Sequence, residues 1–272
     1  MLQKTFHEIE HAAWSERAAQ YDAIFASVST QAINPILDAL GQLQGMRQLD
    51  VACGTGHLVG AASKRGAVSE GVDFAQTMVD VARVNYPRNC FQVADAAQLP
   101  QDDRTFDAIT CSFGLNHMEN PQGAVDEAFR VLKPGGRYAF TLWFGPEDGN
   151  ELQAIIQQAI SAFAVNPLAL PKEWVQLRAA DETACEVITR QAGFRPPTFK
   201  KLSIALQPTS AQEVLDTVNK ISIRTKMILD NQPPTVQQKI YETIRSAIES
   251  RRADGLISLV CPALLTVVQK PG

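Results

Sequence analysis

The sequence predicts an α/β fold in which helices cover both faces of a mostly parallel sheet. Strand-like and helix-like segments alternate five times between about residues 45 and 145, and such alternation implies parallel strands joined by right-handed crossovers. The first strand segment, QLDVACGTG at 48–56, runs into a glycine turn before a helical pattern begins. Glycine allows positive φ and close approach of a ligand, and the next helix offers unpaired N–H groups. We expect the rest of the chain to be arranged around this segment.

Each element of the alternating region follows from its own pattern. Leu49, Val51 and Ala52 form a short apolar, partly β-branched run, typical of a strand buried on both faces. The expected strands that follow span 68–72, 91–94, 106–113 and 137–143, the last entered through the turn Lys133-Pro134-Gly135-Gly136. The expected helices, with apolar residues at helical spacing, span 57–65, 75–85 and 124–132.

The whole chain, 1–272, is expected to be one domain in three parts. These parts are an N-terminal helical cap at 1–44, a core at 45–145 and a C-terminal half at 146–272. In the C-terminal half we expect helices at 150–164 and 181–192 and strands near 198–206 and 256–268. Two amphipathic segments between about 210 and 253, separated by Pro233-Pro234, predict a helical insertion before the last strand. Packing is the simpler role for this insertion, and a cover over a substrate is the alternative.

Composition restricts the class of partner. The 272 residues are 45% hydrophobic and carry a net charge of -4, which gives no overall field favouring nucleic acid or an anionic membrane. A small molecule is therefore the expected partner. The five cysteines are scattered without a C-x-x-C pair, which argues against a metal or a disulfide and fits a reducing compartment. We read neither a signal-peptide core nor a membrane span in the sequence and expect a cytoplasmic protein.

Glycine or acidic residues stand at the carboxyl ends of three consecutive expected strands: Gly54 and Gly56, then Asp73, then Asp95. In an open parallel sheet the ligand lies outside these ends, so the four residues should line one crevice. A carboxylate at Asp73 is placed to hold ribose hydroxyls, and one at Asp95 could accept from an adenine amino group. Taken singly, each carboxylate is better explained as a cap of the next helix or turn. Together they favour a nucleotide-like ligand.

Three segments occur in a characteristic order: LDVACGTG, then GVDFAQTMVDVAR, then the blocks from VADAAQLP to KPGGRYAF. They resemble class I S-adenosylmethionine-dependent methyltransferases, particularly the small-molecule branch that includes the ubiquinone and menaquinone C-methyltransferases. The resemblance covers roughly residues 45–145 and implies a Rossmann-like fold with a seven-stranded sheet. One departure is Ala52, where many relatives have the first glycine of the motif. A methyl group there should be tolerated and should slightly tighten the cradle.

The resemblance implies S-adenosyl-L-methionine as the cofactor and assigns residues to each part of it. The expected cofactor-binding residues are Asp50, Ala52, Gly54 and Gly56 at the methionine moiety, Asp73 at the ribose, Phe74 and Met78 on the adenine faces, Asp95 and Ala96 at the adenine edge, Ser112 near the methionine amine, and Tyr21 from the N-terminal helices. Apolar residues at helical spacing are usually core, which is the alternative role of Phe74 and Met78.

The reaction that this resemblance implies is methyl transfer to a small-molecule acceptor by in-line displacement. A sulfonium is already an activated methyl donor, so the protein mainly aligns the acceptor and excludes water. His117, in the LNHM loop after the fourth strand, is the candidate for orienting or deprotonating the acceptor, with Asn116 beside it. A hydrogen bond that merely shapes the loop is the alternative role of His117.

Three other functions use similar residues. A NAD-dependent dehydrogenase would share the glycine turn and the ribose acid, but the third glycine of G-x-G-x-x-G is replaced by Val59. A protein that binds S-adenosylmethionine without transferring its methyl group, like some pericyclase-like relatives of secondary metabolism, stays open. A nucleic-acid methyltransferase is disfavoured, because the segment 112–118 lacks an N-P-P-Y type motif. The acceptor, the methylated atom and the oligomeric state also stay open.

Overall fold

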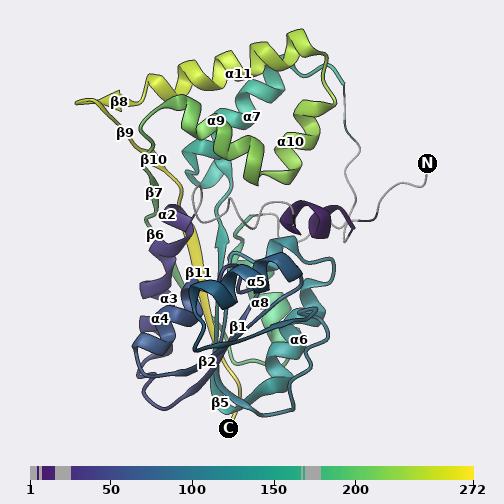
Figure 1. The fold of residues 1–272 in the computed structure, drawn as a ribbon, viewed down its shortest axis with the longest axis vertical. Coiled ribbons are helices and arrows are strands. Elements are labelled where there is room, and N and C mark those ends of the chain that lie inside the picture. The colour runs from purple at the N-terminus through teal and green to yellow at the C-terminus, as the bar shows by residue number, and fades with distance from the viewer. Residues whose placement is uncertain (1–4, 6–7, 16–25, 167, 169–178) are drawn as a thin grey trace.

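The computed structural model describes residues 5, 8–15, 26–166, 168 and 179–272. Its centre is a seven-stranded sheet in the order β3-β2-β1-β4-β5-β11-β6 (Figure 1). The neighbours from β3 to β5 run parallel, and β11 is antiparallel to both β5 and β6. The predicted Rossmann-like, mostly parallel sheet is therefore confirmed. Its strands are β1 (Arg47–Val51), β2 (Val68–Asp73), β3 (Cys90–Val93), β4 (Phe106–Ser112), β5 (Leu132–Trp143), β6 (Thr198–Leu202) and β11 (Ala263–Gln269).

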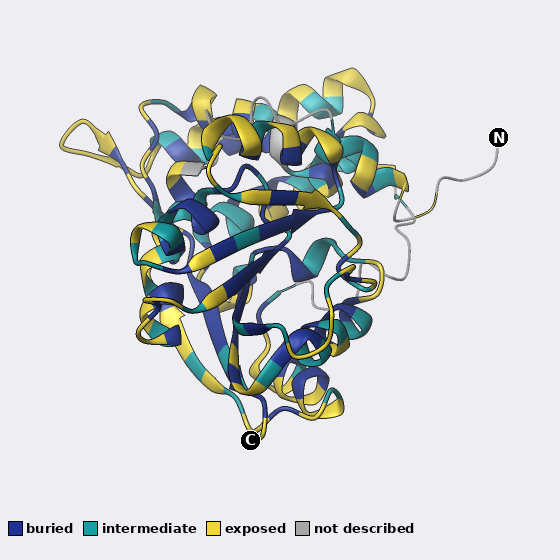
Figure 2. Ribbon diagram, turned by 60° about the horizontal axis from the view of Figure 1, so that its bottom comes forward, coloured by how far each residue is buried: buried dark blue, intermediate teal, exposed yellow. Residues whose placement is uncertain are grey.

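Helices cover both faces of the sheet, and each face has its own apolar core. One core joins α3 (Ile33–Leu40) and α4 (His57–Lys64) to Ala108 of β4. The other joins α6 (Pro121–Val131) and α8 (Glu182–Gln191) to the next residue of that strand, Ile109. Consecutive residues of a strand point to opposite faces, so β4 contributes to both cores. Figure 2 shows the central strands mostly buried and many exposed residues on the outer sides of the helices and in the loops. The edge strands β3 and β6 are mostly exposed.

Strand β1 departs from the predicted apolar run on one of its faces. Leu49 and Val51 pack in the core next to α6, as expected. Gln48 and Asp50, which alternate with them, are buried polar residues. Gln48 Nε2 donates to Thr110 Oγ1 at 2.7 Å, and Thr110 Oγ1 donates to Asp50 Oδ1 at 2.6 Å. These hydrogen bonds satisfy polar atoms inside the sheet and join β1 to β4.

Some predicted strand boundaries are wrong. Strand β5 begins at Leu132, before the predicted turn at 133–136, and its pairing with β4 is irregular between Phe106 and Ala108. The expected strand near 198–206 consists of β6 and a separate β7 (Ala205–Leu206), which pairs with β10 (Leu259–Val260). The last expected strand is likewise divided, because Cys261 and Pro262 separate β10 from β11. The projecting hairpin of Figure 1 is formed by β8 (Arg252–Ala253) and β9 (Leu256–Ile257).

The predicted helical insertion forms, but it contains three helices instead of two. These are α9 (Ala211–Ile221), α10 (Ile223–Asp230) and α11 (Pro234–Glu249), and the chain turns between the first two at Ser222. Helix α11 packs against α7 (Glu151–Phe163) and α9 through Ile240, Ile244 and Ile248, which are fully buried. The insertion therefore packs as part of the main core, above the sheet in Figure 1. Within the described residues, no helix has both the length and the apolar character needed to cross a membrane.

The N-terminal part is helical where it is described. Residues 8–15 form a helical segment. They are followed, after an undescribed stretch, by α2 (Ala26–Ser29), a 3-10 turn η1 (Thr30–Ala32) and α3. Tyr21, a predicted cofactor contact, lies outside the described residues.

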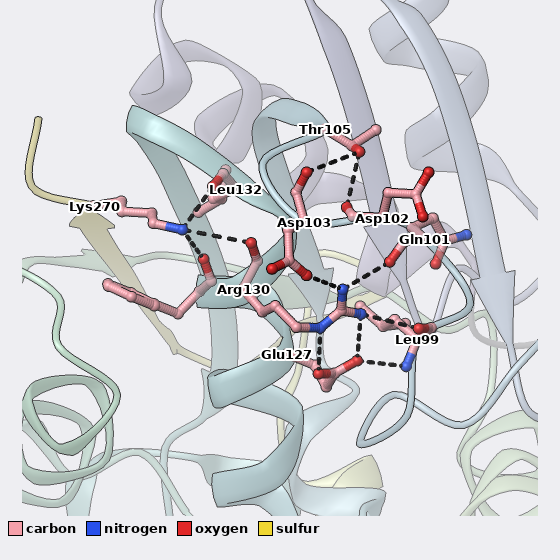
Figure 3. Close-up of polar contacts among 10 residues, drawn as sticks. Leu99, Gln101, Asp102, Asp103, Thr105, Glu127, Arg130, Leu132 and Lys270 are labelled. Atoms are coloured by element: carbon pink, nitrogen blue, oxygen red, sulfur yellow. Dashed lines mark hydrogen bonds and ion pairs between the residues drawn. The ribbon is translucent and has the colours of Figure 1, made fainter.

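The loop that follows β3 is fixed to α6 by the guanidinium of Arg130 (Figure 3). Arg130 donates to the carbonyl oxygens of Leu99 and Gln101 at 3.0 and 2.9 Å. It also pairs with Asp103 and with both carboxylate oxygens of Glu127 at 2.7 to 2.8 Å. Each of the five guanidinium N–H groups thus has an acceptor, which is the geometry that arginine satisfies best.

We predict that Arg130→Met lowers the free energy of unfolding by about 1–3 kcal/mol, because loop carbonyls and Glu127 lose a charged donor while the apolar stem is retained. Urea unfolding followed by circular dichroism measures the change. Asp103→Asn is the matched control, since its side chain is 70% exposed and an exposed ion pair contributes at most about 1 kcal/mol. An equal, small loss in both variants would contradict the role given to Arg130.

Candidate functional site

The turn after β1 has an unusual backbone conformation at three of its residues. Ala52, Gly54 and Gly56 have φ values of 56°, 51° and 87°. Gly56 caps the N-terminus of α4, and a Cβ there would lie 2.9 Å from the ring of Phe91. A Cβ on Gly54 would meet no atom within 4 Å. Gly56 is therefore required by packing, whereas Gly54 borders open space where a ligand can approach the backbone.

Ala52 holds a positive φ that costs an alanine about 1–2 kcal/mol. The chain makes room for its methyl group at Gly114, where a Cβ would lie 2.6 Å from Ala52 Cβ and 2.8 Å from Cys111 Sγ. The predicted departure from glycine at position 52 is thus accommodated, and Gly114 in the loop after β4 makes it possible.

Asp73, at the end of β2, connects the glycine turn to the following helix. Its Oδ2 accepts from Gly54 N at 2.9 Å, and its Oδ1 accepts from Ala75 N at 3.0 Å. Ala75 is the N-cap of α5 (Gln76–Asn85). Burial raises the pKa of Asp73 to about 6, although the backbone donors and the nearby His11 lower it. Phe74 N also donates to this carboxylate. Asp73 therefore holds the turn in place, and its two oxygens together can still accept from a further donor.

Asp50 lies at the end of a polar chain that crosses three strands. Ser69 of β2 donates to Gln48, Gln48 donates to Thr110, and Thr110 donates to Asp50. Burial raises the pKa of Asp50 to about 7, the hydroxyl of Thr110 lowers it, and the charge of Asp73 raises it. The sequence analysis placed Asp50 at the site but missed this chain, because Gln48, Ser69 and Thr110 carry no local signal of burial.

These elements surround a narrow pocket of about 60 Å³ at the carboxyl end of β1. Four predicted residues line it: Asp50, Ala52, Gly54 and Ser112. The opposite wall comes from the N-terminal helices, which contribute Ser29, Thr30 and Ile33. The N-terminal helices thus border the pocket through three residues that the sequence analysis did not single out. The remaining lining residues are Cys53, Thr55, His57 and Leu58.

The residues expected at the adenine lie beside this pocket, in two different environments. Asp95 is exposed and its Oδ1 caps its own turn by accepting from Ala97 N at 2.8 Å, next to the buried Ala96. Phe74 is half-buried, with its ring 5.5 Å from that of His11 in an edge arrangement. Met78 is 3% exposed and packs in one cluster with Phe74, Trp14 and Val81. Met78 thus lies beneath Phe74 as part of a small core.

The loop after β4 carries the predicted catalytic residues on a strained backbone. Phe113 has a φ of 57°, its N–H donates to Thr141 Oγ1 at 3.1 Å, and its ring stacks on Trp143 at 3.9 Å. A positive φ in a bulky residue occurs where the surroundings enforce it. The next turn, η2 (Leu115–His117), presents Asn116 and His117.

His117 contacts both its neighbour and the N-terminal segment. Asn116 Nδ2 lies 3.1 Å from His117 Nε2, and Glu10 Oε2 lies 3.0 Å from His117 Nδ1. The ring of Trp14 meets the His117 ring edge-on at 5.0 Å. Glu10 is a site residue that the sequence analysis missed. It lies 107 positions away, in a segment with only helical periodicity as a signal.

The structure does not assemble a metal site from the residues that it describes. No three His, Cys, Asp or Glu side chains converge among them. A larger groove of about 540 Å³ lies on α11 beside Phe163, open to the surface, and shares no residue with the strand-end pocket. The strand-end pocket and the β4 loop are therefore the candidate site.

We predict that Gly114→Ala lowers the free energy of unfolding by about 1–3 kcal/mol, because the new methyl group overlaps Ala52 and Cys111. Chemical unfolding checks this value. Ala52→Gly in the Gly114→Ala background should recover part of the loss, since it removes one of the two overlapping methyl groups. Strictly additive effects of the two changes would show that the residues do not compete for this space.

Comparison with known proteins gives matches that agree with this geometry. A family model described as a methyltransferase domain matches residues 49–140. A demethylmenaquinone methyltransferase of Clavibacter sepedonicus is 40% identical over 119 residues, which cover 43% of this chain and 46% of the relative. Another, of Beutenbergia cavernae, is 31% identical over 175 residues, covering 61% of this chain and 73% of the relative. The chain thus spans about half of the length of the first relative and about three quarters of the second.

Solved structures agree in fold. Phosphoethanolamine N-methyltransferase 2 of Haemonchus contortus in complex with S-adenosyl-L-methionine superposes with a TM-score of 0.61 at 18% identity, over 100% of this chain and 61% of that one. The sequence matches, the strand order and the glycine turn after β1 lead to the same conclusion. The chain belongs to the class I S-adenosylmethionine-dependent methyltransferases, and its cofactor is S-adenosyl-L-methionine.

Proposed function

We propose that this protein transfers the methyl group of S-adenosyl-L-methionine to a small-molecule acceptor by in-line displacement. The observation that carries the proposal is the convergence of Asp50, Ala52, Gly54 and Ser112 on one pocket, with Asp73 directly beside it. The pocket residues fit the cofactor in charge, because the sulfonium and the amine are cationic and two buried carboxylates lie nearby. The space beside Gly54 is also open, so a ligand can approach the backbone there.

Each part of the cofactor has a candidate partner. Asp73 would accept from the ribose hydroxyls with the lone pairs that Gly54 N and Ala75 N leave available. Asp50 and Ser112 would lie at the methionine end, beside the turn formed by Ala52, Gly54 and Gly56. Phe74 would contact the adenine directly and Met78 would support it from below, with Asp95 and Ala96 at the adenine edge. Tyr21 stays an expectation from the family resemblance.

The chemistry requires alignment more than acid or base strength. The cofactor supplies an activated methyl group when bound. The protein must then place the acceptor in line with that methyl group and keep water away, an effect of position. His117 and Asn116 lie on the β4 loop, at the same strand-end edge as the pocket, and are the groups that would contact the acceptor.

The relatives suggest the class of acceptor. Their names, demethylmenaquinone methyltransferase and ubiquinone biosynthesis O-methyltransferase, refer to quinones. We propose a small, largely apolar acceptor of comparable character for this protein. We also place it in the cytoplasm, because its five cysteines are free and four of them are buried.

The proposed function is tested by titration calorimetry with S-adenosyl-L-methionine and S-adenosylhomocysteine, followed by a screen for transfer of a labelled methyl group. We expect micromolar binding of both molecules and label incorporation into at least one quinol-type or phenol-type acceptor. Binding without incorporation into any acceptor would favour the non-methylating alternative. Folded protein that binds neither molecule would contradict the proposal.

We predict that Asp73→Ala weakens cofactor affinity at least tenfold, about 1.4 kcal/mol, because a charged acceptor of two ribose hydroxyls is lost. The same change frees Gly54 N and Ala75 N, so it should also lower thermal stability. Asp73→Asn removes the charge and retains one oxygen acceptor, so it should keep one of the two backbone hydrogen bonds and recover part of the stability. Calorimetry with unchanged affinity in both variants would refute the ribose contact.

We predict that cofactor affinity rises with pH between about 5 and 8, because Asp50 and Asp73 must lose protons to pair with a cationic ligand. Their pKa values are about 7 and about 6. The stability of the free protein should change in the opposite direction. Both pKa values lie above the unfolded value of 3.8, so their contribution to stability is full below pH 3.8 and is lost as pH rises through 6 to 7. In Asp50→Asn, the dependence of cofactor affinity on pH and the dependence of stability on pH should both become weaker near pH 7, where Asp50 loses its proton.

We predict that His117→Ala slows methyl transfer while leaving cofactor affinity nearly unchanged, because the ring lies on the β4 loop and does not line the strand-end pocket. Single-turnover transfer of a labelled methyl group and calorimetry measure the two quantities separately. His57→Gln is a suitable comparison, since His57 lines that pocket and its replacement should affect affinity first. Wild-type kcat in His117→Ala would remove His117 from the mechanism.

A further inference from the structure

Two donors converge on one oxygen of Glu10, a buried acidic residue of helical segment 8–15. Trp14 Nε1 donates to Glu10 Oε2 at 2.9 Å, and His117 Nδ1 lies 3.0 Å from the same oxygen. The Glu10 residue is only 4% exposed. A buried carboxylate needs such partners, because leaving its charge unpaired away from water is costly. The N-terminal segment therefore reaches directly into the β4 loop.

These contacts determine which ring nitrogen of His117 carries the proton. An ionised carboxylate can only accept, so Nδ1 must hold the hydrogen that faces Glu10. In a neutral imidazole the other nitrogen, Nε2, then carries the lone pair. Asn116 Nδ2, a donor, lies 3.1 Å from Nε2, which agrees with this tautomer, and an acceptor hydroxyl must take the place of that amide at Nε2. Both neighbours of the ring thus leave Nε2 as the basic nitrogen.

Asn116 supplies an independent sign of a missing partner. Its Oδ1 atom is buried and accepts no hydrogen bond from any described residue. An unsatisfied buried acceptor is expensive, and in native structures such atoms often mark a ligand contact or another functional role. A bound molecule with a further hydrogen-bond donor, besides the hydroxyl that faces His117, would satisfy it.

The surroundings restrict what such a molecule can be. Ile9, Ala13 and Trp14 pack against Ile223 and Met227 of α10, so the face of segment 8–15 toward α10 is apolar (Figure 1, where the dark purple helix lies below α10). Among the residues that the structure describes, the carboxylate of Glu10 lies in direct contact with His117. An anionic acceptor, such as a phosphate or carboxylate, would be repelled by that charge. The geometry favours a neutral molecule.

We propose that Glu10 is a positioning residue that fixes His117 in its Nδ1–H tautomer, so that Nε2 deprotonates a neutral, apolar acceptor with a weakly acidic hydroxyl of the phenol or enol class. This inference rests on the proposed methyl transfer. In the step, the acceptor oxygen, or the carbon conjugated to it, forms a bond to the methyl carbon. The bond between that carbon and sulfur breaks with its electron pair left on sulfur. The acceptor proton moves to His117 Nε2, and Glu10 stabilises the resulting imidazolium.

A purely structural role for Glu10 is the competing explanation, in which the residue only anchors the N-terminal segment. The two explanations differ in what they predict for the His117 ring. Anchoring concerns the position of residues 8–15, whereas the proposal concerns the tautomer of a ring on another element. A measurement of the tautomer separates them without any acceptor or cofactor.

The experiment is ¹⁵N NMR of the full chain labelled at histidine, with His117→Gln used to assign the His117 signals. We expect His117 of the wild type to be in the Nδ1–H form when neutral. Glu10→Gln should lose this preference, because an amide can donate as well as accept. Trp14→Phe is the matched control, since it removes the other hydrogen bond to the same oxygen and retains the carboxylate. It should keep the wild-type tautomer.

The second arm uses 2-naphthol and 2-naphthoate as probes of the acceptor class. We expect 2-naphthol to shift the His117 Nε2 signal and 2-naphthoate to leave it unchanged. If 2-naphthol or another phenol is methylated, Glu10→Gln should reduce kcat about a hundredfold, the lower end of what a positioned base contributes, with cofactor affinity retained. Glu8 is exposed, so Glu8→Gln should leave kcat unchanged.

The outcomes distinguish this inference from the proposed function. An Nε2–H tautomer in the wild type, or an unchanged tautomer in Glu10→Gln, would overturn the role of Glu10. A stronger response to 2-naphthoate than to 2-naphthol would overturn the acceptor class. If His117 has the expected tautomer but the protein does not bind S-adenosyl-L-methionine, the result would refute the proposed function and leave the role of Glu10 in setting the tautomer intact.

Discussion

The carboxylate of Asp73 is the interaction on which the site depends. It accepts from Gly54 N on one side and Ala75 N on the other, so one side chain holds the glycine turn, the end of β2 and the start of α5 together. Asp50 and Gly54, which line the strand-end pocket, are held in position by this turn. Because these bonds are to backbone atoms, they fix the shape of the cradle independently of neighbouring side chains.

The site holds several groups in states that are unfavourable without a ligand. Burial raises the pKa of both Asp50 and Asp73, Ala52 and Phe113 have positive φ, and Asn116 Oδ1 has no described partner. A cationic cofactor would favour the ionised carboxylates, and a further hydrogen-bond donor on the acceptor would satisfy Asn116. Strain and desolvation of this kind are common at functional sites, where the rest of the fold supplies the stability that maintains them.

The acceptor side is built from parts of the chain that are distant in sequence. Helical segment 8–15 lies between α10 of the insertion and the β4 loop. It makes apolar contacts with α10, and its Glu10 pairs with His117 of the loop. The packing role predicted for the insertion is confirmed, whereas a cover over a substrate stays a prediction. The insertion packs in the main core through α11, and through α10 it supports the segment that covers His117.

The sequence by itself determined the sheet, the alternation of helices and the strand-end positions of Gly54, Asp73 and Asp95, because these follow from local periodicity and turn chemistry. It did not determine the division of the insertion at Ser222, since a helix can continue or turn at a serine depending on what it packs against. Tertiary structure alone decided the polar chain through Gln48 and Thr110, the room that Gly114 leaves for Ala52, and the pairing of Glu10 with His117. Each of these joins residues on different elements, and local pattern carries no information about which elements will meet.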